Sequence, residues 1–308
     1  MDNKKFQLAN KKFRKQKMKT LLVADSYQRL GQTKRAMRVR FCGSILQFTL
    51  KNGNTDRLIA ANFCRDRLCP MCQWRKSIKI FSDVSRIMRC ISTDSPTVKP
   101  LFLTLTIKNC PGADLKNTIK TLFDGWHRMV NTKWFKNNIV GSFRALEITY
   151  NVKMGEYHPH LHCILLVHEK YFYSAEYMTT RQWAELWQRS CRLIYMPSTF
   201  IRSVSKKNNN MYRLVAEIAK YTVKSSDFLF NDKKLTDDVI DTLQTGMKHK
   251  RLFAFGGIMK SVANELKIND KNINNINLTD EIRGDIAECI ITYRWNMGIY
   301  QYVIDDDM

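Results

Sequence analysis

Three histidines occupy every second position of a stretch rich in strand-forming residues: His158, His160 and His162. Alternate side chains of a strand project from the same face, so this spacing predicts a row of imidazoles on one side of a sheet. A preceding apolar stretch carries one acidic residue, Glu147, and a turn is expected at 153–155. In a simple hairpin Glu147 then lies opposite His160. Imidazoles and a carboxylate on one face can bind Mg²⁺ or Mn²⁺ and leave coordination positions for substrate oxygens.

The third protein ligand of such a site has two candidates. Hairpin geometry favours Glu147, whereas His158 competes because it belongs to the same row as the other two histidines. Pro159 lies within the row and cannot donate a backbone hydrogen bond, which predicts a sheet edge or a bulge there. The alternative to a metal site is a histidine-rich strand that faces solvent.

A predicted helix over 211–224 carries a second set of reactive groups. Glu217 and Tyr221 are four residues apart and therefore share a helical face, with Lys224 about one turn beyond Tyr221. A tyrosine hydroxyl is a nucleophile for phosphoryl transfer when cations offset the developing charge, and a nearby carboxylate can activate water or another hydroxyl. Such pairs are common on helix surfaces, so this one gains its meaning from the histidine row.

Four cysteines indicate a structural zinc site. Cys64, Cys69 and Cys72 follow a C-x4-C-x2-C pattern, and Cys42 precedes a predicted hairpin. Structural Zn²⁺ is commonly held by four thiolates. The alternative, small buried hydrophobic residues, fits poorly with three cysteines so close together beside Pro70. Cys42 has the weakest support of the four.

The composition indicates a polyanionic partner. The chain has 308 residues, and 51 Lys plus Arg against 28 Asp plus Glu give a formal charge of +23. Because neutralising phosphates releases counterions, nucleic acid is the first expectation, an anionic membrane surface the second, and a merely soluble basic protein the third. We find no apolar run long enough to span a bilayer and no secretory signal, which predicts a cytoplasmic location.

Hydrophobic periodicity predicts an alternation of strands and helices. The first 37 residues are polar and basic and predict a solvated, partly disordered arm that can contact phosphates. Pro96 and Pro100 predict a linker, and the chain is expected to end in an acidic tail. The expected strands are 44–52, 57–63, 101–107, 143–151, 156–167, 200–204 and 251–257, and the expected helices are 74–91, 115–130, 174–193, 211–224 and 258–266.

Three of these stretches resemble, in order and spacing, the motifs of rolling-circle plasmid replication initiators of the HUH endonuclease superfamily. They are FLTLTIKN at 102–109, HPHLHCILLV at 158–167 and EIAKYTVKSSD at 217–227. The stretches RVRFCGS, ANFCRDRLCPMCQWRKS, ALEITYN and RLFAFGG are similar to further parts of that family. The resemblance covers about 38–266 and is closest to the Rep proteins of small Gram-positive plasmids, which carry one tyrosine and an upstream glutamate in the third motif.

The resemblance implies a reaction. Tyr221 would attack a phosphodiester at the plasmid origin, leaving a 5′-phosphotyrosine and a free 3′-OH that primes synthesis. His160 and His162, with a third ligand, would hold the Mn²⁺ or Mg²⁺ ion, and Glu217 would activate water at termination. The implied partners are origin DNA, single-stranded or extruded as a hairpin, and a host helicase and DNA polymerase, with no membrane. The oligomeric state is not predicted.

The implied fold class is α+β, an HUH endonuclease core in which helices flank an antiparallel sheet, with an N-terminal zinc-binding subdomain. The expected domains are a basic arm at 1–37, a cysteine-rich zinc-binding subdomain and helix at 38–95, the nicking and joining domain at 96–235, and a C-terminal extension at 236–308. The sequence is also compatible with two other functions: a zinc-containing, non-catalytic DNA-binding repressor, and an HUH transposase or relaxase.

Overall fold

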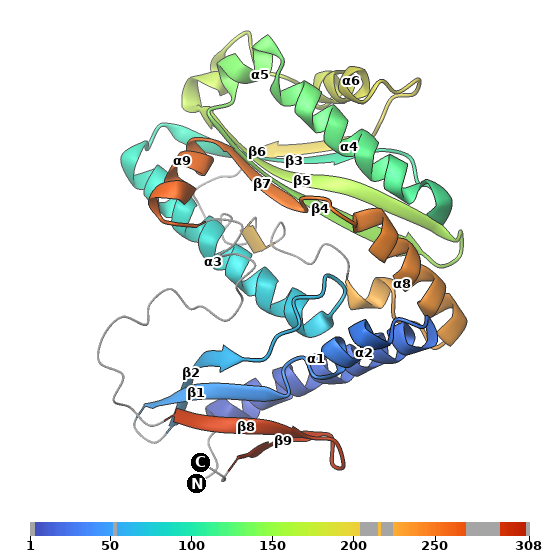
Figure 1. The fold of residues 1–308 in the computed structure, drawn as a ribbon. Helices are drawn as coiled ribbons and strands as arrows, with labels where there is room; N and C mark the ends of the chain where they lie inside the picture. The colour runs from blue at the N-terminus through green and yellow to red at the C-terminus, as the bar shows by residue number, and fades with distance from the viewer. Residues whose placement is uncertain (1–3, 52–53, 204–214, 217–223, 269–289, 306–308) are drawn as a thin grey trace. The chain divides into compact units, whose positions relative to one another are not determined.

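The computed structural model describes residues 4–51, 54–203, 215–216, 224–268 and 290–305 (Figure 1). The chain forms two compact units, the first from residues 1–76, 229–240 and 270–308 and the second from residues 77–228 and 241–269. These units cross the expected domain boundaries, because parts of the predicted C-terminal extension belong to each of them. Helices α3 (Pro70–Asp94) and α8 (Lys233–Met247) each contribute residues to both units.

The second unit is built on a five-stranded antiparallel sheet with the order β6-β3-β5-β4-β7. Its strands are β3 (Val98–Thr106), β4 (Gly141–Asn151), β5 (Glu156–His168), β6 (Thr199–Ser203) and β7 (Phe253–Gly257). The turn between β4 and β5 falls where it was expected, and Gly155 adopts a positive φ of 66° there. Leu161, Cys163 and Leu165 on β5 are fully buried, as the strand pattern predicts.

Helices cover both faces of this sheet. They are α4 (Leu115–Val130), α5 (Lys133–Asn138), α6 (Thr180–Cys191) and α9 (Ile258–Glu265), with short 3-10 turns η1 (Gly112–Asp114), η2 (Glu169–Tyr173) and η3 (Ser225–Asp227). Arg144, opposite Cys163 on β4, lies over the Phe123 ring of α4, so α4 covers that face. A Cβ on Gly141, which is opposite Leu166, would meet Ile258, so α9 begins on the other face.

Two prolines, Pro100 and Pro159, lie within strands of this sheet, at positions where the described backbone pairing involves one neighbouring strand. The predicted linker at Pro100 is wrong, because β3 begins at Val98. Within the described residues β6 pairs with residues 101–105, so Pro100 lies outside the described part of that ladder. Pro159 pairs with Ile148 of β4 without a register shift, while the β3 ladder ends one residue later, at His160. The expected edge or bulge at Pro159 is therefore wrong: the proline lies on the central strand β5, in a short gap between the β3 ladder and the Cys110–Tyr157 bridge, and the β4 ladder shows no register shift there.

The first unit contains a four-stranded antiparallel sheet with the order β2-β1-β8-β9. Its strands are β1 (Ile45–Lys51), β2 (Asn54–Ala61), β8 (Ile290–Asn296) and β9 (Gln301–Ile304). The expected β1–β2 pairing is confirmed, and its turn residues 52–53 lie outside the described part of the chain. No strand was predicted for 290–304, but this segment alternates like a strand, and it pairs with β1 and with itself. The predicted acidic tail, DDDM at 305–308, lies almost entirely outside the described residues.

The expectation of a disordered basic arm is also wrong. Residues 4–40 form α1 (Lys4–Arg29) and α2 (Thr33–Arg40). Phe13, Ala24 and Tyr27 of α1 are almost fully buried at helical spacing, and Phe13 packs edge-to-face against Trp74. The many lysines of α1 obscure this apolar stripe in the sequence. No helix in the described part of the chain is both long and apolar enough to cross a membrane.

Candidate functional site

The predicted histidine row and its acidic partner meet on one face of the five-stranded sheet. The β4–β5 register places Glu147 directly opposite His160, as hairpin geometry predicted. Glu147 Oε2 lies 2.7 Å from His162 Nε2 and 3.3 Å from His160 Nε2, and the two Nε2 atoms are 3.1 Å apart. The three side chains are 8–12% exposed, so these donor atoms are concentrated at an almost buried point.

The donor set fits a divalent cation. His160 Nδ1 lies 3.2 Å from the His158 carbonyl, which only accepts, so the tautomer that donates from Nδ1 offers the Nε2 lone pair to a cation. If His162 Nδ1 donates a hydrogen bond to Thr104 Oγ1, 3.1 Å away, then the Nε2 atom of His162 also offers a lone pair to a cation. Two lone pairs and a carboxylate oxygen then face one another. Their separations match the edge of an octahedron with Mg²⁺-type bonds, about 3 Å.

His158 lies in the row but outside this group. The ligand atoms that fall within 4.8 Å of one another belong to Glu147, His160 and His162. His158 Nδ1 instead lies 2.7 Å from Asn109 Oδ1, and the Asn109 amide donates to Glu156 Oε2 at 3.2 Å. The geometry therefore favours Glu147 as the third ligand.

Lys224 contacts the carboxylate oxygen of Glu147 that does not face the histidines. Its ammonium lies 3.0 Å from Glu147 Oε1, and its side chain is 42% exposed. Burial alone would raise the pKa of Glu147, but hydrogen bonds with His160 and His162 and the Lys224 ammonium outweigh it and hold that pKa well below its usual range. Glu147 is therefore an anion at neutral pH and is able to bind a cation.

Two side chains of β3 orient His162 and were missed in the sequence. Thr104 lies opposite His162 and contacts its Nδ1, and the Phe102 ring stacks on the imidazole at 5.6 Å with an interplanar angle of 21°. Hydrogen bonding to the far ring nitrogen fixes the direction of a ligating histidine. The alternation of 102–106 was a usable signal, since Phe102 and Thr104 share the phase opposite to the leucines.

Two other predicted site residues cannot be placed. Glu217 and Tyr221 lie outside the described residues. The chain on either side is described: Val215 is buried, and residues 225–227 form the 3-10 turn η3 after Lys224. Their roles remain predictions.

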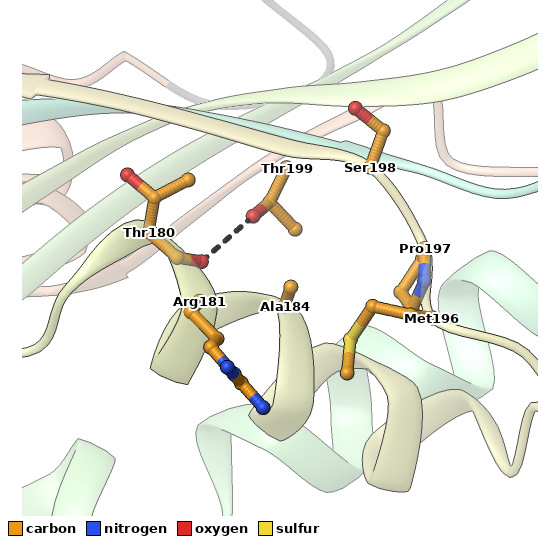
Figure 2. Close-up of a pocket in the computed structure, with 7 residues that line it drawn as sticks. All are labelled: Thr180, Arg181, Ala184, Met196, Pro197, Ser198 and Thr199. Carbon is orange, nitrogen blue, oxygen red and sulfur yellow. Dashed lines mark hydrogen bonds between the residues drawn. The ribbon is translucent and has the colours of Figure 1, made fainter.

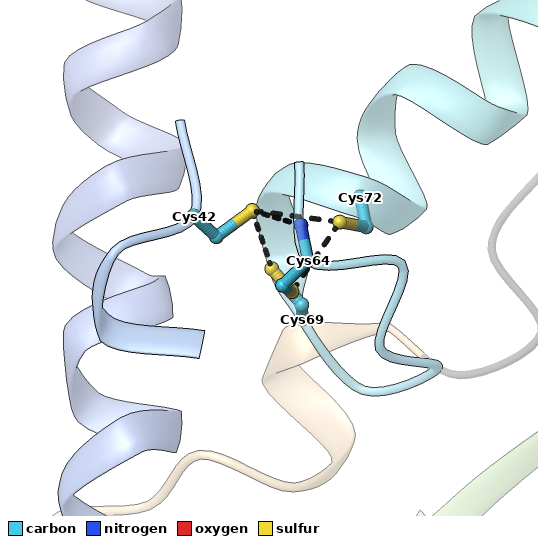
Figure 3. Close-up of side chains that lie close together, drawn as sticks. All are labelled: Cys42, Cys64, Cys69 and Cys72. Carbon is cyan, nitrogen blue, oxygen red and sulfur yellow. Dashed lines mark hydrogen bonds between the residues drawn. The ribbon is translucent and has the colours of Figure 1, made fainter. Parts of the chain in front are cut away.

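The four predicted cysteines converge in the first unit (Figure 3). Cys42 Sγ lies 3.5 Å from the sulfur atoms of Cys69 and Cys72, and Cys64 Sγ lies 3.6 Å from Cys72 Sγ. All four are free thiols. Sulfur atoms around a tetrahedral Zn²⁺ with bonds of about 2.3 Å are about 3.8 Å apart, so the cluster has the dimensions of a structural zinc site.

Backbone groups and a buried lysine organise the cysteine cluster. The N–H groups of Cys64 and Arg65 donate to Cys42 Sγ and Cys72 Sγ at 3.3 and 3.2 Å. Lys17 of α1 is fully buried and donates to the Cys42 carbonyl at 2.8 Å. Burial lowers the pKa of Lys17 to about 8, and the thiol groups oppose that shift. The role of Lys17 was missed, because it belongs to a lysine-rich segment that looks uniformly exposed.

Comparisons with known proteins identify the family of the chain. The family described as replication protein matches residues 55–303. "Protein rep" of Streptococcus pneumoniae serotype 2 (strain D39 / NCTC 7466) is 30% identical over 96% of this chain and 92% of its own length. The corresponding values for "Protein rep" of Lentilactobacillus hilgardii are 32%, 95% and 94%, and for that of Lactiplantibacillus plantarum 33%, 95% and 95%.

No solved structure matches the chain. The family match nevertheless covers far more than half of the sequence, including three of the four cluster cysteines (Cys64, Cys69 and Cys72) and both strands that carry the metal-ligand candidates. The relatives align over nearly their whole length. The chain therefore belongs to the replication protein (Rep) family, as its resemblance to rolling-circle plasmid initiators predicted.

Proposed function

We propose that this Rep protein initiates rolling-circle plasmid replication by nicking one strand of origin DNA and joining itself to the new 5′ end through Tyr221. The observation that carries the proposal is the convergence of Glu147, His160, His162 and Lys224 on one face of an antiparallel sheet. Family membership makes a repressor, transposase or relaxase the weaker alternative. The experiment that tests the proposal is covalent capture of a labelled, origin-containing single strand in Mn²⁺ or Mg²⁺.

The arrangement of the motifs supports an HUH core. The first and second motifs lie on β3 and β5, which pair so that Thr104 is opposite His162. The third motif ends at Lys224, which reaches Glu147 on β4. Residues far apart in the sequence are thus gathered around one point of a five-stranded antiparallel sheet with helices on both faces, as the resemblance implies.

In the nicking step the Tyr221 hydroxyl releases its proton to water, its oxygen attacks the scissile phosphorus, a new P–O bond forms, and the bond to the 3′ oxygen breaks. The leaving oxygen takes up a proton and becomes a 3′-OH. Lys224 offsets negative charge on the phosphate, and the ionised Glu147 orients both the ammonium and the imidazoles. A divalent cation held by Glu147, His160 and His162 would supply a Lewis acid that polarises a phosphate oxygen.

Glu217 is proposed to act only at termination, where it activates the water that replaces a second tyrosine. A Glu217→Ala variant is therefore expected to nick at nearly the wild-type rate, while termination falls by about 100-fold or more, the contribution of a general base. The measurement compares the nicked-product rate with the yield of released circular single strands in a replication assay. Normal termination by this variant would remove Glu217 from the mechanism.

We also propose that the cysteine cluster binds one structural Zn²⁺. Purified protein is expected to contain about one tightly held zinc ion per chain, and Cys69→Ser is expected to lose the ion and the folding of the first unit. Zinc binding of this kind contributes on the order of 10 kcal/mol to folding. Cys90→Ser is the matched control, since Cys90 lies on α3 outside the cluster. A zinc-free protein that is fully folded would contradict the assignment.

The partner of both units is proposed to be plasmid origin DNA, as a single strand or an extruded hairpin. The net charge of +23 supplies the electrostatic attraction to it. The free 3′-OH requires a DNA polymerase to extend it and a helicase to open the duplex ahead. Both are proposed to come from the host.

A further inference from the structure

Strand β6, at the edge of the five-stranded sheet, carries two exposed side chains, Phe200 and Arg202, on the same face as His160 and His162. Phe200 and Arg202 are two residues apart on β6 and therefore share a face. Phe200 lies opposite Thr104, which lies opposite His162 on the next strand. A row of side chains thus runs across three strands, from a candidate metal ligand to the sheet edge, where Phe200 remains 53% exposed.

Aromatic and cationic groups are in contact along this part of the face. The Phe102 ring, only 4% exposed, stacks on His162 and meets the Phe200 ring edge-to-face at 6.4 Å. The Arg202 guanidinium lies 5.1 Å from the centre of the Phe102 ring, so its described contact is with an aromatic face and not with a carboxylate. Phe102 forms a buried floor, and Phe200 and Arg202 are the groups left open to a ligand.

Hydrogen bonds at the start of β6 and its pairing with β3 fix the backbone of the strand that carries Phe200 and Arg202. On the opposite side of β6, Thr199 Oγ1 donates to the Thr180 carbonyl at the start of α6, at 3.2 Å (Figure 2). Thr106 Oγ1 donates to the carbonyl of Ser198, just before β6, at 2.7 Å. These contacts and the β3 ladder fix the backbone, so Phe200 and Arg202 are presented without a large ordering cost on binding.

We infer that Phe200 and Arg202 form a subsite for single-stranded DNA beside the scissile phosphodiester, in which Phe200 stacks on a base and Arg202 contacts a backbone phosphate. The inference rests on the proposed nicking function, because that function places the scissile phosphate at Glu147, His160 and His162. Two strand spacings put Phe200 roughly 10 Å from His162, which is about one or two nucleotides along the strand. Base stacking tolerates any sequence, so this subsite adds affinity and holds the strand in place.

The first test measures binding without cleavage. A fluorescein-labelled oligothymidylate of about 15 nucleotides is titrated with full-length protein in a buffer without added Mn²⁺ or Mg²⁺. Phe200→Ala is expected to bind about tenfold more weakly, and Phe200→Trp, which keeps a stacking ring, about as tightly as wild type. Tyr173→Ala is the matched control, because Tyr173 is an even more exposed aromatic of the same unit, at 86%. Wild-type affinity of Phe200→Ala would overturn the subsite.

The second test locates the stacked base. One thymidine of the same oligonucleotide is replaced by 5-iododeoxyuridine, which on irradiation cross-links to an aromatic ring stacked on it. The cross-link is expected in the peptide that contains Phe200, both in wild type and in Tyr173→Ala, and to be lost in Phe200→Ala. A cross-link confined to peptides that lack Phe200 would contradict the inference.

Neither test requires Tyr221 or a metal ion, so the two proposals fail separately. A protein that binds and cross-links through Phe200 but never nicks DNA supports the subsite and contradicts the proposed reaction. A protein that nicks DNA while Phe200→Ala binds like wild type supports the reaction and contradicts the subsite.

Discussion

Replacing Glu147 with alanine is expected to lower the rate of strand nicking by at least about 1000-fold, because it removes the proposed anionic metal ligand and the carboxylate that the Lys224 ammonium contacts. His160→Ala and His162→Ala are expected to cause losses of the same order. The measurement is single-turnover nicking of a labelled single strand over a range of Mn²⁺ concentrations, so that weaker metal binding and slower chemistry are separated.

His158→Ala is the matched control for these variants. His158 is in the same row, but its imidazole contacts Asn109 and not the three converging donors. Its removal is expected to reduce nicking by less than about tenfold, the lower end of effects beyond the first ligand shell. If His158→Ala is as damaging as His162→Ala while Glu147→Ala is mild, His158 is the third ligand and Glu147 is not.

Tyr221→Phe is expected to abolish the covalent protein–DNA complex and to lower nicking by at least about 10⁴-fold, because it removes only the oxygen proposed as the nucleophile. The phenyl ring keeps the shape of the side chain, so binding of uncleaved oligonucleotide should be unchanged. Complex formation is measured as a mobility shift that survives denaturation. A Tyr221→Phe variant that still forms the complex would show that another group is the nucleophile.

Tyr195→Phe provides the matching control. The Tyr195 hydroxyl accepts a hydrogen bond at 2.9 Å from the Lys108 N–H, just beyond the end of β3, and the Lys108 ammonium lies over its ring. This tyrosine is therefore close to the end of the first motif but already engaged with the chain. Tyr195→Phe should form the covalent complex in full, and loss of the complex in that variant would point to Tyr195 as the nucleophile.

The central part of the site was predictable because its determinants are local. A short turn between β4 and β5 fixes the register of one hairpin, and the period of two along a strand then fixes which side chains share a face. Glu147 opposite His160 follows from these two facts. The cysteine cluster is similar, since three of its members lie on one short segment.

Other parts depend on contacts between distant segments. β8 pairs with β1, which lies more than 240 residues earlier in the chain, and β9 extends the sheet by pairing with β8, so the pairing with β1 cannot be read from the local sequence. The apolar stripe of α1 is buried although the helix is rich in lysine. One of these lysines, Lys17, is itself buried beside the cysteine cluster. Thr104 and Asn109 contact histidines only after β3 has paired with β5. A sequence pattern indicates the secondary structure that a segment prefers. These contacts depend instead on which distant segments pack or pair with one another in the folded protein.

The polarity of label transfer tests the central claim most directly. A single strand containing the origin is labelled at its 3′ end, incubated with the protein and Mn²⁺, denatured and digested with a protease. A 5′-phosphotyrosine linkage predicts that the 3′ label remains on a peptide that contains Tyr221, while a strand labelled at its 5′ end yields a free fragment with a 3′-OH. Attachment of the 5′-labelled fragment, or of DNA to a peptide without Tyr221, would contradict the account.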